Sequence, residues 1–95
     1  SGIVTNGNYQ LGGRTVVEII KPNNNSQQQG KVVVTIRVDR SGNVISATPS
    51  VKGSTTTNAY LYSKAKEAAL KTTFEANTTA PEIQVGTIIY NFKLN

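Results

Sequence analysis

The sequence contains neither cysteine nor histidine among its 95 residues. The absence of cysteine excludes a disulfide framework and a thiolate metal site, so the fold must depend on its hydrophobic core. The absence of histidine removes the commonest general base and a common metal ligand. Five acidic residues remain, and none lies in a pattern that would activate a nucleophile or hold a cation. The composition therefore predicts a protein that is not an enzyme and that uses no cofactor and no metal.

Long apolar runs are also absent. No stretch approaches the roughly 20 apolar residues that span a bilayer, and no signal peptide is recognisable. The length suits one small domain. Ser1 and Gly2 are typical of the remnant that a protease leaves after removal of a purification tag. Residues 1–8 are therefore expected to be a tag scar and a disordered N-terminus, and residues 9–95 to form the folded domain.

Positive charge exceeds negative charge, with ten basic and five acidic residues and a formal net charge of +5. The basic residues are spread along the chain without a run, which favours an ordinary surface with a preference for acidic partners. A nucleic-acid-binding domain is the alternative from a different class. Six aromatic residues leave few for a base-stacking platform, so we expect no nucleic acid among the partners.

The clearest structural signal is "GKVVVTIRVDRSGNVISATPSV". Val32, Val34, Ile36 and Val38 alternate with more polar residues and predict one buried strand face. The turn "DRSG" supplies an aspartate that can bind backbone amides and a glycine that can adopt positive φ. The pattern predicts a β-hairpin with strands at 31–39 and 43–48.

One helix is predicted after this hairpin, in "TTNAYLYSKAKEAALKTTF". Thr57 or Asn58 can cap its N-terminus by accepting hydrogen bonds from the first free amides. Phe74, just after the last turn, is expected to close one end of the core. The buried stripe at helical spacing consists of Leu61, Tyr62, Ala65, Ala68, Ala69 and Thr72.

The chain ends on "GTIIYNFKLN", which alternates as a strand should. Residues 15–20 add a possible short N-terminal strand. The predicted fold class is α+β, with an antiparallel three-stranded sheet and the main helix packed on one face. Counting strand directions places 31–39 between 43–48 and 87–94, which is the order 2-1-3 for the hairpin and terminal strands. On this prediction the terminal strand is an edge.

An exposed edge can bind an extended segment by adding it as a further strand. Because no catalytic residues are predicted, this edge is the best candidate for function. The alternative is that residues 14–20 fold back along it and have to be displaced. The partner-binding residues predicted for the edge are Thr87, Ile88, Ile89, Tyr90, Asn91, Phe92, Lys93 and Leu94.

The segments "LGGR", "GKVVVTIRVDRSGNVISATPSVKGSTTTN", "AKEAALKTTF" and "GTIIYNFKL" occur in this order between residues 9 and 95. Together they resemble the C-terminal domain of TonB energy transducers, in the version common in Bacteroidetes-type bacteria. Each segment alone is a weak signal, but their order and spacing are fairly specific.

The resemblance implies a periplasmic domain of a protein that is anchored in the inner membrane outside this chain. Its partner would be the TonB box of outer-membrane TonB-dependent transporters, which would pair with residues 87–94. An inner-membrane motor complex would act through the N-terminal region to drive substrate import with proton-motive energy. Related domains also form intertwined dimers, so a homodimer is compatible with the resemblance.

Two related functions are alternatives to a transducer. One is a TonB-like binding or sensing module appended to a membrane-bound peptidase or another envelope protein. The other is a TolA-like domain that bridges the envelope. Both would use the same small α+β fold without catalytic residues.

Overall fold

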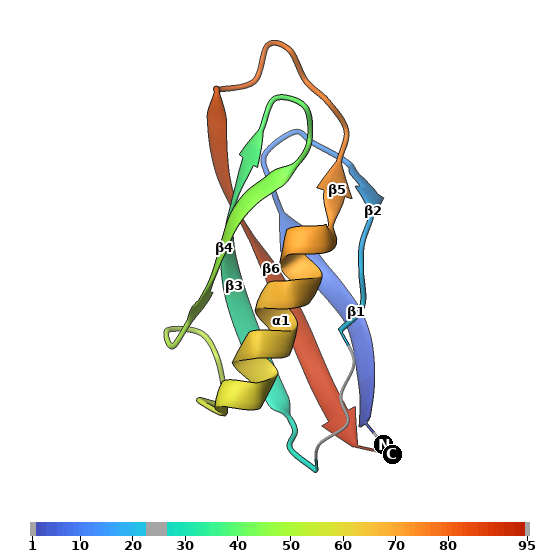
Figure 1. Cartoon of the computed structure of the whole chain (residues 1–95), viewed down its shortest axis with the longest axis vertical. Helices are drawn as coiled ribbons and strands as arrows, with labels where there is room; N and C mark the ends of the chain where they lie inside the picture. Colours follow the sequence, from blue (N-terminus) through green and yellow to red (C-terminus); the bar gives the residue numbers. More distant parts are fainter. Residues whose placement is uncertain (1, 23–26, 95) are drawn as a thin grey trace.

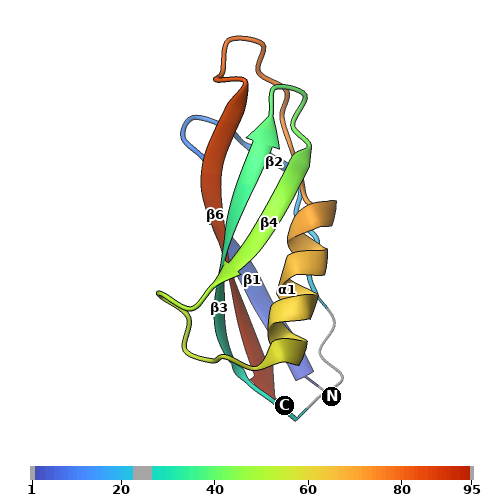
Figure 2. The ribbon, with the colours of Figure 1, turned by 60° about the vertical axis from the view of Figure 1, so that its left-hand side comes forward.

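The structure, a computed structural model, describes residues 2–22 and 27–94, with side chains for 9–22 and 27–93. Four strands form an antiparallel sheet in the order β1 (Gly2–Gln10), β6 (Ile83–Leu94), β3 (Gly30–Asp39) and β4 (Val44–Ser50), as Figure 1 shows. Helix α1 (Ala59–Lys71) covers one face of this sheet (Figure 2). Two short strands, β2 (Val16–Glu18) and β5 (Thr73–Phe74), pair beside it. The α+β class with an antiparallel sheet is confirmed.

The predicted neighbours within the sheet are confirmed, because β3 lies between β4 and β6. The prediction of only three strands is wrong, since β1 adds a fourth strand beyond β6. The prediction that residues 1–8 are disordered is wrong for residues 2–8, which belong to β1, while Ser1 lies outside the described residues. The physical reason is that a strand can be held mainly by hydrogen bonds to the backbone of its neighbour. Its own sequence then need not show the side-chain pattern that predicts a strand.

The hairpin forms as predicted, and its turn has the predicted chemistry. Asn43 N donates to Asp39 Oδ1 over 2.9 Å, and Gly42 N donates to Asp39 O over 3.1 Å. Gly42 has a φ of 95°, and a Cβ there would lie 1.9 Å from the carbonyl oxygen of Phe74. Only glycine fits this turn, because it tolerates positive φ and lets β5 approach the hairpin.

Helix α1 begins where the capping rule predicts. Asn58 is the N-cap, and its Oδ1 accepts a hydrogen bond of 3.0 Å from Leu61 N. The predicted stripe is buried except for Tyr62, which is partly buried. Phe74 is 2% exposed and closes the core beside the end of the helix, as predicted.

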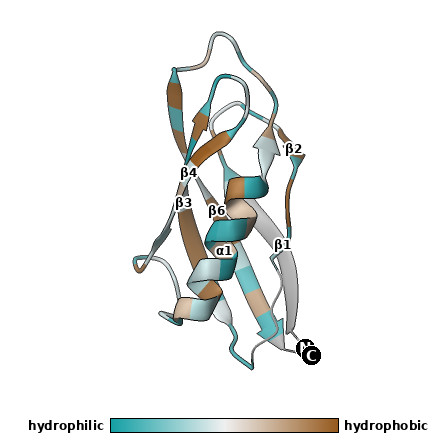
Figure 3. Cartoon of the chain, viewed as in Figure 1, coloured by the Kyte–Doolittle hydropathy of each residue, from teal (hydrophilic) through white to brown (hydrophobic). Residues whose placement is uncertain are grey.

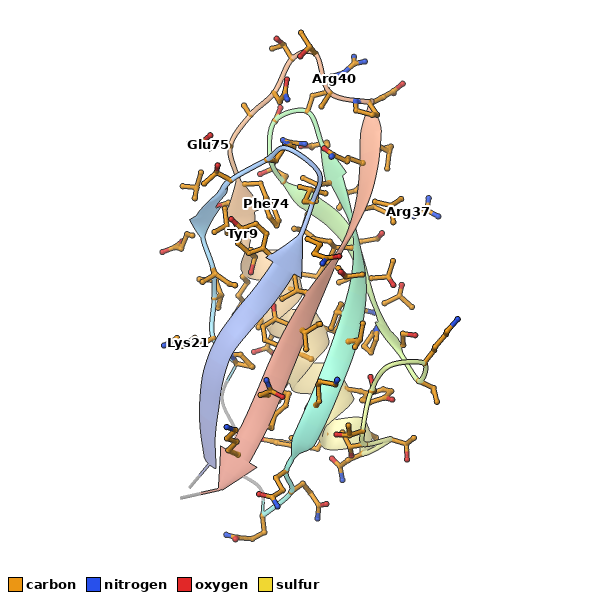
Figure 4. All side chains as sticks on the ribbon, turned by 180° about the vertical axis from the view of Figure 1, so that it is seen from behind. Tyr9, Lys21, Arg37, Arg40, Phe74 and Glu75 are labelled. Carbon is orange, nitrogen blue, oxygen red and sulfur yellow. The ribbon has the colours of Figure 1, made fainter. Side chains whose placement is uncertain are left out.

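The core lies between α1 and the inner face of the sheet. Val32, Val34, Ile36 and Val38 of β3 are fully buried on this face. Figure 3 shows apolar and polar residues alternating along β6, so that this strand has an apolar inner face and a more polar outer face. No element of the described residues covers the outer face, which points toward the viewer in Figure 4.

The molecule is elongated, with principal extents of 43 × 23 × 17 Å. We call one end the terminal end, where β1 begins at Gly2 and β6 ends at Leu94 (Figure 1). We call the other the turn end, where the β3–β4 turn and the loop before β6 lie. Helix α1 begins toward the terminal end, because the segment before it bonds to the first residues of β3: Lys31 N donates to Thr55 Oγ1 over 2.7 Å.

Candidate strand-addition site

The predicted binding strand is internal in the sheet. Strand β6 pairs with β3 on one side and with β1 on the other, so the prediction that residues 87–94 form an edge is wrong. The predicted antiparallel pairing of β3 with β6 is confirmed, but residues 2–8, expected to be disordered, form part of the strand on the other side of β6. The side of β6 that was predicted to bind a partner is therefore paired with a strand of the same chain.

The eight predicted site residues divide by face. Ile88, Tyr90 and Phe92 point into the core and are 0%, 1% and 1% exposed. Lys93 is exposed on the outer face. The outer face also carries Thr87, Ile89 and Asn91, each partly buried, and the side chain of Leu94 lies outside the described ones. Only the outer-face residues can contact a partner by their side chains. The backbone groups of alternate residues point toward the side of β1, since those of the others point toward β3.

Strand β1 occupies the site along its whole length. Its register runs from Gly2 opposite Leu94 to Gln10 opposite Thr87, and it is interrupted by a bulge between Thr5 and Asn8. Its sequence, "GIVTNGNYQ", has two glycines and two asparagines, which are poor strand formers. Among the elements, β1 makes its contacts almost entirely with β6. Pairing with β6 is therefore what holds this segment as a strand.

The prediction that residues 14–20 could cover the site is wrong. The strand in this segment exists, but β2 pairs with β5, with Val16 opposite Phe74, and not with β6. Strand β5 in turn is joined to the hairpin by an isolated bridge between Thr73 and Asn43. Residues 14–20 thus lie on the helix side, where they complete the core, and the sequence immediately before them covers β6.

The end of β1 is fixed by two contacts of the Tyr9 side chain, a ring contact and a hydrogen bond. The rings of Tyr9 and Phe74 meet edge to face, with centroids 5.6 Å apart and planes at 68° (Figure 4). Val16 N donates to the Tyr9 hydroxyl over 3.3 Å. After Tyr9 the chain turns through Gly12 and Gly13, and Gly13 has a φ of 72°. The glycine pair is thus a pivot between β1 and the residues that follow it.

Arg14, directly after this pivot, is a buried anchor that the sequence analysis did not single out. It is 6% exposed and has no carboxylate among its partners in the described residues. Its Nε and Nη2 donate to Glu75 O over 3.1 and 2.7 Å, and Nη1 donates to Asp39 O over 2.9 Å. Weaker bonds reach Arg40 O at 3.4 Å and Gln84 Oε1 at 3.5 Å. One guanidinium therefore ties the chain after β1 to the hairpin turn and to the segment before β6.

Strand β1 does not pair with the first residues of β6, because its pairing ends at Gln10 opposite Thr87. No strand of the described residues pairs with residues 83–86 on the side of β1, although β3 pairs with them on the other side. Ile83 and Val85 are 40% and 59% exposed there. A shallow hollow lies where the strands part, lined by Tyr9, Gln10, Leu11, Gly12, Val85, Gly86 and Thr87. The start of β6, residues 83–85, is therefore a short open edge, while Gly86 is buried with Gln10 and Leu11 close against it.

Tyr90 gives the site strand a measurable pH dependence. Among the described side chains its hydroxyl has no hydrogen-bond partner. Burial raises the pKa of Tyr90 from 10.0 to about 12, which outweighs the opposing effect of the Thr72 side chain. The protonated phenol is therefore the form that the folded state prefers.

This shift predicts a loss of stability at high pH. Below pH 10 Tyr90 is protonated in both states, so the shift has no effect. Between about pH 10 and 12 the unfolded chain ionises first, and the free energy of unfolding falls by roughly 2–3 kcal/mol in total. Urea unfolding across this range measures the loss. The variant Tyr90→Phe has no ionisable group at this position, so its free energy of unfolding should fall less between these two pH values, by this amount. An equal fall in the two proteins would contradict the prediction.

Comparison of the chain with models of known protein families gives no match, and comparisons with curated proteins and with solved structures give no significant match either. Within the described residues, no helix is long and apolar enough to cross a membrane. The resemblance to TonB transducers accordingly stays a prediction made from the sequence.

Proposed function

We propose that this chain is the periplasmic C-terminal domain of a TonB-type energy transducer, whose partner is the TonB box of outer-membrane transporters. The partner segment would add to β6 along residues 87–94 in the place that β1 occupies. Tension from the inner-membrane motor complex would then reach the transporter through this pairing. The sequence resemblance supplies the family, and the arrangement of β1 supports a site that accepts an extended strand.

The observation that carries the proposal is that β6 already holds an added strand with few ties to the rest of the domain. Apart from the contacts of Tyr9 with Phe74 and Val16, β1 contacts β6 almost exclusively among the elements, and it is connected to the domain through the pivot at Gly12 and Gly13. The side chain of Arg14 fixes the chain immediately beyond. Residues 2–10 can therefore leave β6 while the core, which α1 and β3 form, stays assembled.

The energetics of exchange are close to balanced. A partner strand would replace the main-chain bonds of β1 with equivalent ones, so the net gain per bond is small. Because β1 is attached to the domain, it competes at an effective concentration in the millimolar range. The partner gains an advantage at residues 83–85, where β6 has no strand to displace on that side. Pairing can begin at this open edge and proceed into residues 87–94 as β1 peels away.

A titration with a peptide tests the proposal. We expect an extended peptide derived from the N-terminal segment of a transporter to shift the backbone amide signals of residues 83–94 in the NMR spectrum. The signals of residues 2–10 should move toward random-coil positions in the same titration, because the peptide replaces β1. Intermolecular nuclear Overhauser effects to β6 would identify the contact directly.

The control in this experiment is a peptide of the same composition with a proline in its centre, which cannot donate the central hydrogen bond. It should bind weakly or not at all. Shifts concentrated on β4 or on α1, with β1 unchanged, would contradict the proposed site. They would also favour binding at the other edge of the sheet, which is formed by β4.

A further inference from the structure

The outer face of the sheet is an uncovered surface whose side chains the strand registers arrange in rows. Its residues on β3 and β6 are those that alternate with the buried ones, because neighbouring residues of a strand point to opposite faces. The row through Thr35 joins Thr48 of β4 to Thr87 of β6, and the row through Val33 reaches Ile89. Short hydroxyl-bearing and β-branched side chains therefore form the middle of this face.

Three cationic side chains surround this middle. Lys31 is opposite Asn91 of β6, and Lys93 lies two residues further along the same face. Arg37 lies about 20 Å from Lys31 along β3, since each residue of a strand advances about 3.3 Å. Among the described side chains the sole ion pair lies elsewhere, on α1. The one acidic residue on the described strands of this face is Asp39, whose carboxylate already accepts a hydrogen bond within the hairpin turn.

Two of the cations border a shallow hollow at the terminal end. Lys31, Lys93 and Asn91 line it together with Gln29 and Thr55, and its volume is about 650 Å³. Each of these five side chains can donate a hydrogen bond, and none is a carboxylate. Lys31 N donates to Thr55 Oγ1 over 2.7 Å, so the Thr55 hydroxyl keeps its own hydrogen for another acceptor. The hollow therefore suits an anion with several acceptor oxygens, such as a phosphate group.

We propose that the outer face of the sheet docks on a lipid bilayer with anionic phospholipid headgroups. A headgroup phosphate would lie between Lys31 and Lys93, and Arg37 would contact the same bilayer surface. Each lysine or arginine close to an anionic bilayer raises the affinity about fivefold, so three of them give roughly a hundredfold preference over a neutral bilayer. Docking does not depend on the strand that adds to β6, because it uses side chains of the face and strand addition uses backbone groups at the edge.

The composition of the face favours a bilayer over other anions. A surface with many phosphates can meet cations that lie about 20 Å apart at the same time, whereas a small anion meets only those at the hollow. No aromatic side chain of the described strands lies on this face, so the bases of a single-stranded nucleic acid would have no ring to stack on. Partly exposed Val33 and Ile89, with Val85 at 59% exposure, offer apolar contact to the interfacial region of a bilayer.

Sedimentation with lipid vesicles tests the docking. One set of vesicles consists of equal parts of phosphatidylcholine and phosphatidylglycerol, and the other of phosphatidylcholine alone. We expect the protein to bind the first set and hardly the second, and to lose this binding at 1 M salt, where the Debye length is about 3 Å. The double variant Lys31→Gln, Lys93→Gln should bind the anionic vesicles about 25-fold more weakly.

The matched control removes two charges from the helix side of the sheet. The double variant Lys21→Gln, Lys66→Gln has the same net charge as the test variant, but its exposed positions follow β2 and lie on α1. It should bind the vesicles as the unmodified protein does. The variant Lys31→Arg, Lys93→Arg keeps both charges and should also retain binding, and thermal unfolding of each variant checks that the fold is intact.

A spin label reports which face meets the lipid. The chain has no cysteine, so a label can be attached at one engineered position. Thr48→Cys places it on the outer face, and Ser63→Cys places it on the exposed surface of α1. With anionic vesicles we expect the label at position 48 to lose mobility and access to a water-soluble relaxation agent, while the label at position 63 keeps both.

Three results would overturn the inference. Equal binding to the two kinds of vesicle, or equal losses in the test and control double variants, would show that the outer face does not recognise anionic lipid. Protection of the label at position 63 in place of position 48 would assign lipid contact to the helix side. Tighter binding to a short duplex DNA than to anionic vesicles at the same salt would make nucleic acid the partner. Each of these results leaves the pairing of β6 untouched, so the peptide titration decides the proposed function separately.

Discussion

Joining β1 to β6 by a disulfide is expected to abolish binding of a partner strand. Thr5 and Asn91 are direct partners in the β1–β6 register, so the double variant Thr5→Cys, Asn91→Cys places two sulfurs opposite each other. Directly opposed residues in antiparallel strands have Cα atoms about 4.5–5.5 Å apart, within the range that a disulfide spans. The chain has no cysteine of its own, so no other bridge can form. With β1 locked, residues 87–94 cannot be freed, and peptide titration should give no detectable affinity until a reductant is added.

A second bridge in the same sheet is the control. Thr35 and Thr48 are partners in the β3–β4 register, and their replacement by cysteine joins two strands that the partner does not separate. This oxidised variant should bind the peptide as the unmodified protein does. If the bridge between β1 and β6 left the affinity unchanged, the partner would have to bind at another place, and strand exchange on β6 would be refuted.

Replacement of Arg14 by methionine is expected to cause the largest loss of stability. The substitution leaves the carbonyl oxygens of Glu75 and Asp39 without these donors at partly buried positions around the buried Arg14 side chain. Loss of a buried polar hub of this kind costs about 3–5 kcal/mol, a large part of the total stability of a domain this small. Urea denaturation followed by circular dichroism measures the change.

Two further variants make this prediction specific. Arg14→Lys keeps the positive charge but cannot reach several acceptors in different directions, so it should lose an intermediate amount of stability. Arg37→Met removes an exposed arginine from the outer face of β3 and should change the free energy of unfolding by less than about 0.5 kcal/mol. Equal effects at the two positions would show that Arg14 is not an anchor.

The elements with strong local signals were predictable from the sequence. The hairpin has period-two alternation and a turn with aspartate and glycine at the required places, and the helix has an asparagine cap and a spaced apolar stripe. In each case the residues that decide the structure lie within a few positions of one another. The neighbours of β3 also followed, because the strand directions leave few ways to pair three strands antiparallel.

The fourth strand was not predictable by the same reasoning. Residues 2–10 contain glycine and asparagine where a strand signal would need β-branched residues, and their partners lie about 80 positions away in β6. Arg14 presents a similar problem, because nothing in "LGGR" separates an arginine that binds distant carbonyl oxygens from one that faces solvent. Both features arise from contacts between remote segments. The terminal strand and its pairing with β3 were thus predicted correctly, but its other neighbour, β1, was not.

The anchored pivot after β1 has a mechanical consequence for the proposed transducer. While β1 is paired, a chain leading into residue 2 pulls on the domain at the terminal end. Once a partner has replaced β1, the same chain pulls at Arg14, near the turn end. The nine residues of β1 span about 30 Å when extended, so the point of load moves along most of the 43 Å length of the body. Binding would thus move the point at which force is applied to the domain from the end where β6 finishes to the end where it begins.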